Sequence, residues 1–432
     1  MKAGQIRDNS VFYLKEAWSS LLQNRTGMFV LLLVFGLNIH FLFSHSRLST
    51  SPLSRYKTVE CLLEHHTFEI NKSSFPASID AISVNGRFYS DKPPLYSVIM
   101  ALEAAPMYYL FDVKPSVHAL FYEKYFLLIN QVMPFYLMLV LAFHFMLLLG
   151  FSSTFAALGI VALSICNLTM AYTVSLINHT PTAVFCFLGF YLIALAELKD
   201  TDSFSRKHFF ITGLLFGLAV SYEIYALGLF ACMAAYLLLK YKKFGHVALL
   251  CAGALIPILL GLAINILITG TPLPFYFVKA YFLYENSYWQ NPVGFDALND
   301  GYLKYFFNIT LGHHGVFAIT PLLLFVFLPV TCTPMKRLYN WCKIAGVLTL
   351  ILMVIFTNNY GGYAIGFRFC IFLFPVMIFY CVHAAYRYRM NKMVLVTFLF
   401  LMCCSAFSVW EGLQKDPLIR GSIDQFLLKD IQ

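Results

Sequence analysis

Residues 27–45 read GMFVLLLVFGLNIHFLFSH and contain no Asp, Glu, Lys or Arg. A helix needs about 20 predominantly apolar residues to cross the hydrocarbon core of a bilayer, and this run is long enough. Runs of the same kind recur along the chain, without the short alternating segments that are typical of a membrane β-barrel. The sequence therefore predicts an all-α protein that crosses the membrane many times.

The composition supports the same fold class. The 432-residue chain is 60% hydrophobic and 12% charged, with a mean hydropathy of +0.72, whereas soluble globular chains carry about 25% charged residues. An ordinary soluble enzyme and a disordered chain are both excluded. The net charge of +9 is better explained by the side of the membrane on which basic residues lie than by nucleic-acid binding, and we expect no nucleic-acid partner.

Eleven segments are predicted to span the membrane. They are residues 27–45, 118–147, 154–176, 181–198, 208–223, 225–240, 246–269, 315–332, 344–357, 368–386 and 393–410. Residues 95–111 are also apolar but contain Glu103 and Pro106, so we expect an interfacial helix that lies on the membrane instead of crossing it.

Basic residues cluster on alternate connections between these spans. The clusters are Lys2, Arg7, Lys15 and Arg25; Lys199, Arg206 and Lys207; Lys240, Lys242 and Lys243; Lys336, Arg337 and Lys343; and Arg387, Arg389 and Lys392. Because short cytoplasmic loops carry an excess of Lys and Arg, the N-terminal segment 1–26 is predicted to be cytoplasmic, ahead of an uncleaved first span. The C-terminal tail 411–432 is then extracytoplasmic.

Two long polar connections interrupt the transmembrane domain, 27–410, on the extracytoplasmic side: residues 46–94 and residues 270–314. Loops held by a rigid scaffold often carry function, so we expect the chemistry on this face. The eleven cysteines lie mostly inside apolar runs, Cys61 is the one placed in an exterior loop, and their spacing indicates neither a zinc site nor a disulfide framework.

The sharpest local signal is residues 85–96, NGRFYSDKPPLY. A residue before proline is restricted to extended conformations, so Lys92 has a stiff backbone, and Pro94 is well suited to begin a helix. An ammonium held beside a helix N-terminus suits a phosphate group. Asp91 is adjacent and Asp80 lies earlier in the same loop. A surface turn with solvated charges remains the alternative.

Arg368 stands at the start of an apolar span, after glycines at 361, 362 and 366. A cation at the membrane edge indicates function, or an interfacial arginine that extends its head group to water. Glu223 lies between two short spans, either as a carboxylate facing an active site or as a loop residue bonded to backbone amides.

Three histidines are expected at the exterior edge, namely His179, His313 and His314. A single histidine is more often a packing or hydrogen-bonding residue than a metal ligand. No two of them have the spacing of ligands on one helix face, so no metal site is predicted.

Several motifs together resemble the GT-C glycosyltransferases, specifically an uncharacterised bacterial subgroup of the protein O-mannosyltransferase and lipid A aminoarabinose transferase branch. In the first loop they are Ser54-Arg55-Tyr56, Glu60, Ile79-Asp80 and Tyr89–Pro94. Further along the chain they are Asn178–Pro181, Gly217–Glu223, Gly312–Phe317 and Asn359–Arg368.

The resemblance implies transfer of a sugar from a polyprenyl-phosphate donor to a hydroxyl of a lipid, glycan or protein. The transfer would take place at the extracytoplasmic face of the bacterial inner membrane. A carboxylate would act as general base, with Asp80 favoured, then Asp91, and Glu60 as a further candidate. Cations would stabilise the leaving phosphate. The expected phosphate ligands are Lys92, Arg87, Arg55 and Arg368, and the expected substrate contacts are Tyr89, His179, Glu223, His313, His314 and Tyr360. Whether the reaction uses a divalent metal cofactor is left open, and no residue is assigned as a metal ligand.

One feature departs from this family. An Asp-Glu pair usually follows the first span, and this chain has the serine-rich stretch 46–54, SRLSTSPLS, in its place. The missing pair favours a non-catalytic relative as one alternative. A transporter or flippase of a lipid-linked or anionic substrate is another, although such proteins show internal repeats and broken helices and no repeat is visible here.

Overall fold

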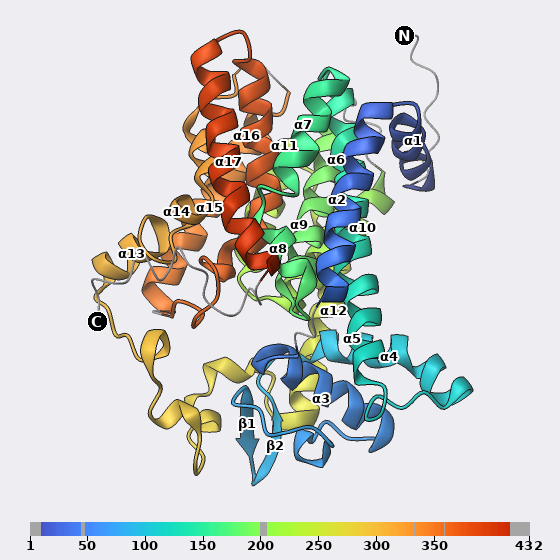
Figure 1. Cartoon of the computed structure of the whole chain (residues 1–432), viewed down its shortest axis with the longest axis vertical. Coiled ribbons are helices and arrows are strands. Elements are labelled where there is room, and N and C mark those ends of the chain that lie inside the picture. The colour runs from blue at the N-terminus through green and yellow to red at the C-terminus, as the bar shows by residue number, and fades with distance from the viewer. Residues whose placement is uncertain (1–9, 45–47, 199–204, 332–333, 358, 415–432) are drawn as a thin grey trace.

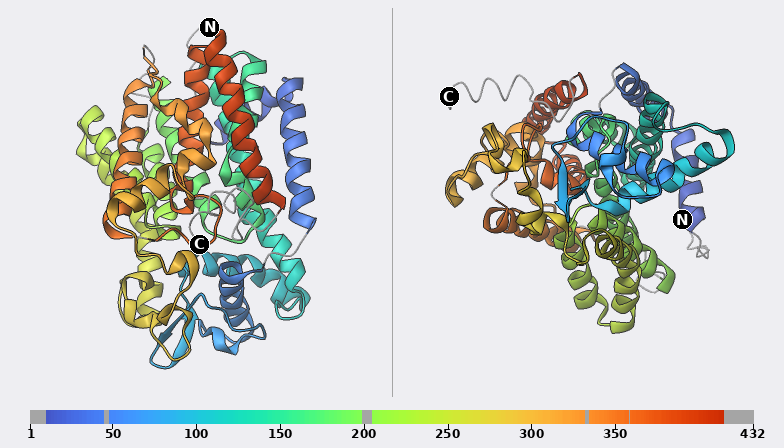
Figure 2. Two further views of the ribbon diagram at one scale, coloured as in Figure 1. Left: turned by 60° about the vertical axis from the view of Figure 1, so that its left-hand side comes forward. Right: turned by 90° about the horizontal axis from the view of Figure 1, so that it is seen from below.

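The computed structural model describes residues 10–44, 48–198, 205–331, 334–357 and 359–414, and their regular secondary structure is almost entirely helical. Long helices form a bundle, and shorter helices with one β-hairpin form a smaller module at one end of it (Figure 1). Figure 2 shows the same division from the side and from below. We call the smaller part the loop module, because it consists of residues 48–118 and 270–296, which largely belong to the two predicted exterior loops.

Seven helical runs among the described residues are long and apolar enough to cross a membrane. They are α2 (Arg25–Ser44), α5–α6 (Ala119–Leu148), α9 (His179–Leu198), α12 (Phe244–Thr269), α15 (Lys336–Phe356), η10–α16 (Arg368–Arg387) and α17 (Lys392–Gln414). An eighth span is formed if α7 (Ser153–Leu163) and the helical run Leu168–Val174, which meet at 55°, are taken together. The chain is thus a multi-pass, all-α membrane protein.

Besides the bent pair at 154–176, three more of the eleven predicted spans differ from full-length crossing helices. Two of them are α10 (Arg206–Tyr222) and α11 (Ala226–Tyr241), with 17 and 16 residues, which is short for the bilayer core. The third is divided into α14 (Val316–Ile319) and the 3-10 helix η9 (Pro321–Phe327), because proline has no N–H to continue a helical ladder.

The segment predicted as an N-terminal cytoplasmic region contains a helix, α1 (Ser10–Leu22). Ala17 and Leu21 are buried, and Ser20 Oγ lies 3.1 Å from His144 Nδ1 on α6 (Met133–Leu148). The C-terminal tail beyond residue 414 lies outside the described residues, so its predicted side of the membrane stays a prediction.

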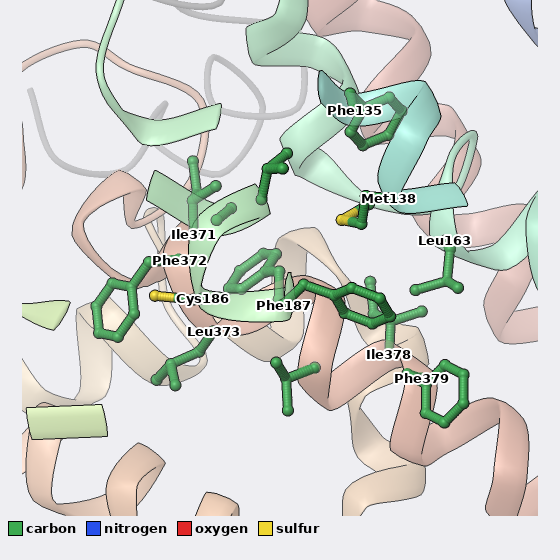
Figure 3. Packing of buried hydrophobic residues seen from close by; sticks show 14 of the residues in the cluster. Phe135, Met138, Leu163, Cys186, Phe187, Ile371, Phe372, Leu373, Ile378 and Phe379 are labelled. Atoms are coloured by element: carbon green, nitrogen blue, oxygen red, sulfur yellow. The ribbon is translucent and has the colours of Figure 1, made fainter. Parts of the chain in front are cut away.

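Aromatic and aliphatic side chains of α6, α7, α9 and α16 (Phe374–Arg387) fill the centre of the bundle (Figure 3). The ring of Phe379 lies 5.3 Å from that of Phe145 and 5.9 Å from that of Phe187, between centroids. All cysteines in the described part of the chain are free. Cys61 is buried, and this burial raises the pKa of its thiol to about 12, so the thiol stays protonated.

Helices α10 and α12 pack almost backbone to backbone. A Cβ atom on Gly213 would lie 1.9 Å from the carbonyl oxygen of Leu250, and one on Gly217 would lie 2.3 Å from that of Ala254. Small residues permit this close approach in membrane helices. The second contact lies four residues after the first on both helices, so α10 and α12 run in the same direction.

The loop module contains α3 (Thr50–Glu64), β1 (Ala81–Val84), β2 (Arg87–Ser90) and α4 (Pro94–Phe111). Asn85 and Gly86 have φ of +52° and +78°, the left-handed conformations that a two-residue hairpin turn requires. The antiparallel register pairs Ala81 with Ser90.

The helix expected at 95–111 is confirmed as α4, although its position relative to the membrane stays a prediction. It begins one residue earlier, at Pro94, and its last residues Leu110 and Phe111 are 75% and 68% exposed.

The α10–α12 contact predicts a clear mutational contrast. Gly217→Ala should destabilise the fold by about 3 kcal/mol or more, because the added methyl group meets backbone that cannot rotate away. Gly36→Ala in α2 is the matched control, since nothing lies within 4 Å of a Cβ there and alanine favours a helix. Thermal unfolding in detergent measures both. Equal unfolding temperatures for the two variants would contradict the close packing.

Candidate functional site

The candidate site is centred on Lys92, which joins two carboxylates. Its Nζ lies 3.2 Å from Oδ2 of Asp80 and 3.0 Å from Oδ2 of Asp91. The three side chains are 16%, 9% and 10% exposed, so the charges interact in a region of low water content. This geometry excludes the alternative of a solvated surface turn.

The hairpin brings the two aspartates together. Asp80 directly precedes β1 and Asp91 directly follows β2, and the pairing of Ala81 with Ser90 places them at the same open end. Pro93 is extended, with ψ of 120°, and Pro94 is the first residue of α4. The backbone on both sides of Lys92 is therefore fixed, by a strand before it and by a proline-initiated helix after it.

Helix α3 supports this end of the hairpin through two serines. Ser51 Oγ donates a hydrogen bond to Oδ2 of Asp80, and Ser54 Oγ contacts both the carbonyl oxygen of Asp80 and the hydroxyl of Ser90. Both serines belong to the serine-rich stretch 46–54 that follows the first span. In this chain, that stretch holds Asp80 in place.

The two aspartates have opposite pKa shifts. Burial disfavours the charge of Asp80, but Lys92, the Ser51 hydroxyl and the more distant Arg368 outweigh it and lower its pKa. For Asp91, burial and the neighbouring charge of Asp80 outweigh Lys92 and raise the pKa. One ammonium cannot fully compensate two buried carboxylates, so a proton enters at Asp91 first as the pH falls.

Arg55 of α3 is 2% exposed and points toward the membrane bundle. Its guanidinium donates to Oδ1 of Asn178, whose amide in turn donates to the carbonyl of Tyr222 at 2.7 Å. Burial lowers the pKa of Arg55 to about 10, although Tyr96, Asp91 and Asp80 favour its charge. It remains a cation at neutral pH.

Arg368 comes from the far end of the chain, at the start of η10 (Arg368–Leu373). It packs against Gly361, where a Cβ atom would lie 2.8 Å from its Nε and where φ is +86°. Its charge acts on the carboxylates of both Asp80 and Asp296. Arg368 therefore lies within electrostatic range of Asp80, one of the two carboxylates that Lys92 contacts.

Asp296 is a carboxylate of this cluster that the sequence analysis missed. It accepts a hydrogen bond of 3.0 Å from the hydroxyl of Tyr288. Burial raises its pKa, against the opposing effects of Tyr288 and Arg368. It stands in a stretch rich in Tyr and Phe, and nothing in its immediate sequence distinguishes it from an ordinary loop aspartate.

His179 and Glu223 form a buried pair at the end of the bundle next to the loop module. His179 Nδ1 lies 2.9 Å from Oε2 of Glu223, and the imidazole packs edge-on against Phe369, the residue after Arg368. The sequence left open that Glu223 bonds to backbone amides. In the structure, the partner of its carboxylate is the imidazole of His179.

His313, His314 and Tyr360 form a second cluster that supports the turn before Arg368. The two Nδ1 atoms are hydrogen-bonded to each other, and His314 Nε2 lies 3.0 Å from the carbonyl oxygen of Gly362. Tyr360 donates to Oδ2 of Asp300 at 2.6 Å. These contacts hold the glycine turn against which Arg368 packs.

Of three other predicted site residues, one lies beside Lys92 and two lie away from it. Glu60 accepts hydrogen bonds from the Ser73 hydroxyl and from the backbone N–H of Ser74 at 2.8 Å, and so fixes a loop. Arg87 is exposed at the turn end of β2, about 10 Å along the strand from Ser90. Tyr89 lines a cavity of about 10 Å³ beside Lys92, room for one water molecule. The structure thus brings Tyr89, and neither Glu60 nor Arg87, to Lys92.

The described residues contain no group of three or more His, Cys, Asp or Glu side chains that could hold a metal ion. The carboxylates of the cluster can accept a proton, and its cations can bind an anion.

Neither a protein-family model nor a curated protein matches this chain. Two solved structures from Archaeoglobus fulgidus are similar to it. Archaeal oligosaccharyltransferase AglB, in complex with an inhibitory peptide and a dolichol-phosphate, has a TM-score of 0.49 and 13% identity, over 92% of this chain and 56% of that one. The apo oligosaccharyltransferase has a TM-score of 0.49 and 14% identity, over 91% and 56%. The chain spans just over half the length of these proteins, and a likeness with a TM-score below 0.5 bears on neither its family nor its activity.

Removal of the central ammonium tests the cluster. Lys92→Ala should lower the stability at neutral pH by about 3 kcal/mol or more, because two buried carboxylates lose their partner. The deficit should shrink as the pH falls toward 4, since Asp91, with its raised pKa, is protonated first. Lys114→Ala is the control, because its pair with Asp112 is 4.0 Å long and exposed and contributes little. A deficit independent of pH would contradict the charge assignment.

Proposed function

We propose that this chain is an integral-membrane glycosyltransferase of the GT-C type, which moves a sugar from a polyprenyl-phosphate donor to a hydroxyl acceptor. The observation that carries the proposal is that Lys92 and Arg55 from the first loop and Arg368 from the start of η10 act on the same buried carboxylates. The motifs with a GT-C resemblance supply all five of these residues.

The location of the cluster suits a lipid-linked donor. Ile268, near the end of span α12, lines the same small cavity as Lys92. His179 and Arg368 are the first residues of two further spans. Span ends lie near the level of the lipid head groups, which is where the phosphate of a polyprenyl phosphate resides while its chain remains in the bilayer.

Two guanidinium groups have donor atoms available for a phosphate. The Nε atoms of Arg55 and Arg368 are buried and have no hydrogen-bond partner within the described part of the chain. Buried donors without partners are costly, and phosphate oxygens would satisfy them with charge-assisted hydrogen bonds. Lys92 would add a third cation by turning from Asp91 toward the phosphate.

The reaction is a displacement at the anomeric carbon of the sugar. The oxygen of the acceptor hydroxyl bonds to that carbon, and the bond from the carbon to the phosphate oxygen breaks. The hydroxyl proton passes to a carboxylate, and polyprenyl phosphate leaves with its charge stabilised by the three cations.

Asp91 is the better candidate for the base, although the sequence favours Asp80. One oxygen of Asp80 is already engaged by Ser51 and Lys92. Asp91 Oδ1 is buried without a hydrogen-bond partner among the described residues, and so can accept a proton from a bound hydroxyl. Asp80 then serves to position Lys92.

The orientation of the protein in the membrane is part of the same proposal. The positive-inside pattern supports an extracytoplasmic site, and the resemblance supports a bacterial inner membrane and a lipid, glycan or protein acceptor. His179, Glu223, His313, His314 and Tyr360 are proposed to shape the substrate pocket next to Arg368. The two loops 46–94 and 270–314 then form the extracytoplasmic part of the transmembrane domain.

The test is a transfer assay with a panel of polyprenyl-phosphate hexoses and pentoses. Asp91→Asn should reduce transfer by about 100-fold or more, while donor binding changes little, because the cations remain. Asp80→Asn should weaken donor binding, because Lys92 loses its anchor. Asp112→Asn is the matched control, since this aspartate is exposed at the end of α4.

Full transfer activity of Asp91→Asn would contradict its role as base. Donor binding by the unmodified protein without transfer from any member of the panel would favour the non-catalytic alternative. Movement of the lipid across vesicles without transfer would favour the transporter.

A further inference from the structure

A second charged region lies at the other end of helices α10 and α12. It is a hollow of about 570 Å³ that is open to the surface. Its lining residues are Arg206, Lys207, Phe210, Gly245, His246 and Leu249. None of them belongs to the candidate site described above.

The hollow lies about one bilayer thickness from the candidate site. Helix α12 connects the two, since His246 lines the hollow and Ile268 lines the cavity beside Lys92. At 1.5 Å per helical residue, these positions are about 33 Å apart, and a bilayer core is about 30 Å thick. The hollow is therefore at the opposite membrane face.

The glycine contacts build this hollow. Because α10 and α12 run in the same direction and touch at Gly213 and Gly217, their first turns lie side by side. Nothing lies within 4 Å of a Cβ built on Gly245, so the space between the two helix ends is not filled by neighbouring side chains.

Among the described residues, the basic side chains around the hollow have no acidic partner. Arg206 and Lys207 are exposed, and within the described ranges neither forms an ion pair. No carboxylate is among the lining residues. Glu197, at the end of the neighbouring α9, is already bound by Tyr236 and Lys240. The hollow therefore attracts an anion.

The lining also has an apolar part. Phe210 and Leu249 lie one helical turn deeper than Arg206 and Gly245 on their respective helices. A basic rim above apolar side chains at a membrane face matches a ligand with a phosphate head and a hydrocarbon portion.

We propose that this hollow is a binding site for a phosphate ester, held by Arg206 and Lys207 with His246 beside them. Two sources share this chemistry: the head group of an anionic phospholipid and a soluble phosphate. The apolar lining favours the phospholipid, with its acyl chain against Phe210 and Leu249.

Native mass spectrometry of the full chain distinguishes these sources. The protein is released from phosphatidylcholine nanodiscs with or without phosphatidylglycerol, and in a third arm is titrated with inorganic phosphate. We expect selective retention of phosphatidylglycerol. Arg206→Gln/Lys207→Gln should reduce it by about tenfold or more, as expected for two basic residues near an anionic head group.

Two further variants make the test specific. Lys336→Gln/Arg337→Gln removes an exposed basic pair in the first turn of α15 that does not line the hollow, and should leave retention unchanged. Gly245→Leu keeps every charge but fills the hollow, and should also reduce retention. Thermal unfolding in phosphatidylcholine should show that all variants remain folded.

The outcomes separate cleanly. Loss of phosphatidylglycerol in both hollow variants, but not in the α15 variant, supports the lipid source. Saturable phosphate binding that Arg206→Gln/Lys207→Gln removes, without lipid selectivity, supports the soluble source. Equal retention by all variants together with no phosphate binding would overturn the proposal.

Discussion

The position of one ammonium between two carboxylates determines how the rest of the candidate site is arranged. Lys92 contacts Asp80 and Asp91 at 3.2 and 3.0 Å, with little water around them. Two buried carboxylates beside one cation are electrostatically unbalanced, and the imbalance separates their pKa values. Such divergence between neighbouring acids is how proteins give similar groups different roles.

The serine-rich stretch after the first span has a structural role in this geometry. Ser51 and Ser54 from this stretch hold Asp80. The acidic groups Asp80 and Asp91 lie at the open end of the hairpin, and α3 supports them. Arg55, from the same helix, completes the connection to the bundle through Asn178.

Much of the fold could be predicted from local sequence. Long apolar runs indicate helices because a bilayer offers no hydrogen-bond partners to an irregular backbone, and α2, α9, α12 and α17 follow them closely. Apolar runs predict that a helix exists more accurately than they predict its length or its interruptions. The polar first turn of α15, starting at Lys336, falls outside an apolar window.

The site was predictable where the chain is stiff or where motifs carried a resemblance. The two prolines indicated the fixed backbone of Lys92, and the glycines before Arg368 indicated a special turn. Asp296 could not be predicted in this way, because its place depends on the fold of the long second loop, which carries no local signal at this residue. Glu60 and Arg87 were suggested by the first loop alone, and burial or exposure separates them from Lys92.

The two faces of the protein are linked by the same pair of helices. α12 reaches from the loop module to the basic hollow, and its glycine contacts with α10 lie in the half nearer the hollow. The candidate site gathers cations around buried carboxylates, whereas the hollow gathers cations without any carboxylate in its lining. This difference suits chemistry at the first place and simple anion binding at the second.

The most direct test of the central claim is an electron cryo-microscopy structure with bound polyprenyl phosphate. The phosphate is expected within hydrogen-bond distance of Lys92 Nζ and of at least one guanidinium from Arg55 or Arg368, with the polyprenyl chain leading into the bilayer. A phosphate bound away from these three side chains, or at the opposite membrane face alone, would contradict the claim.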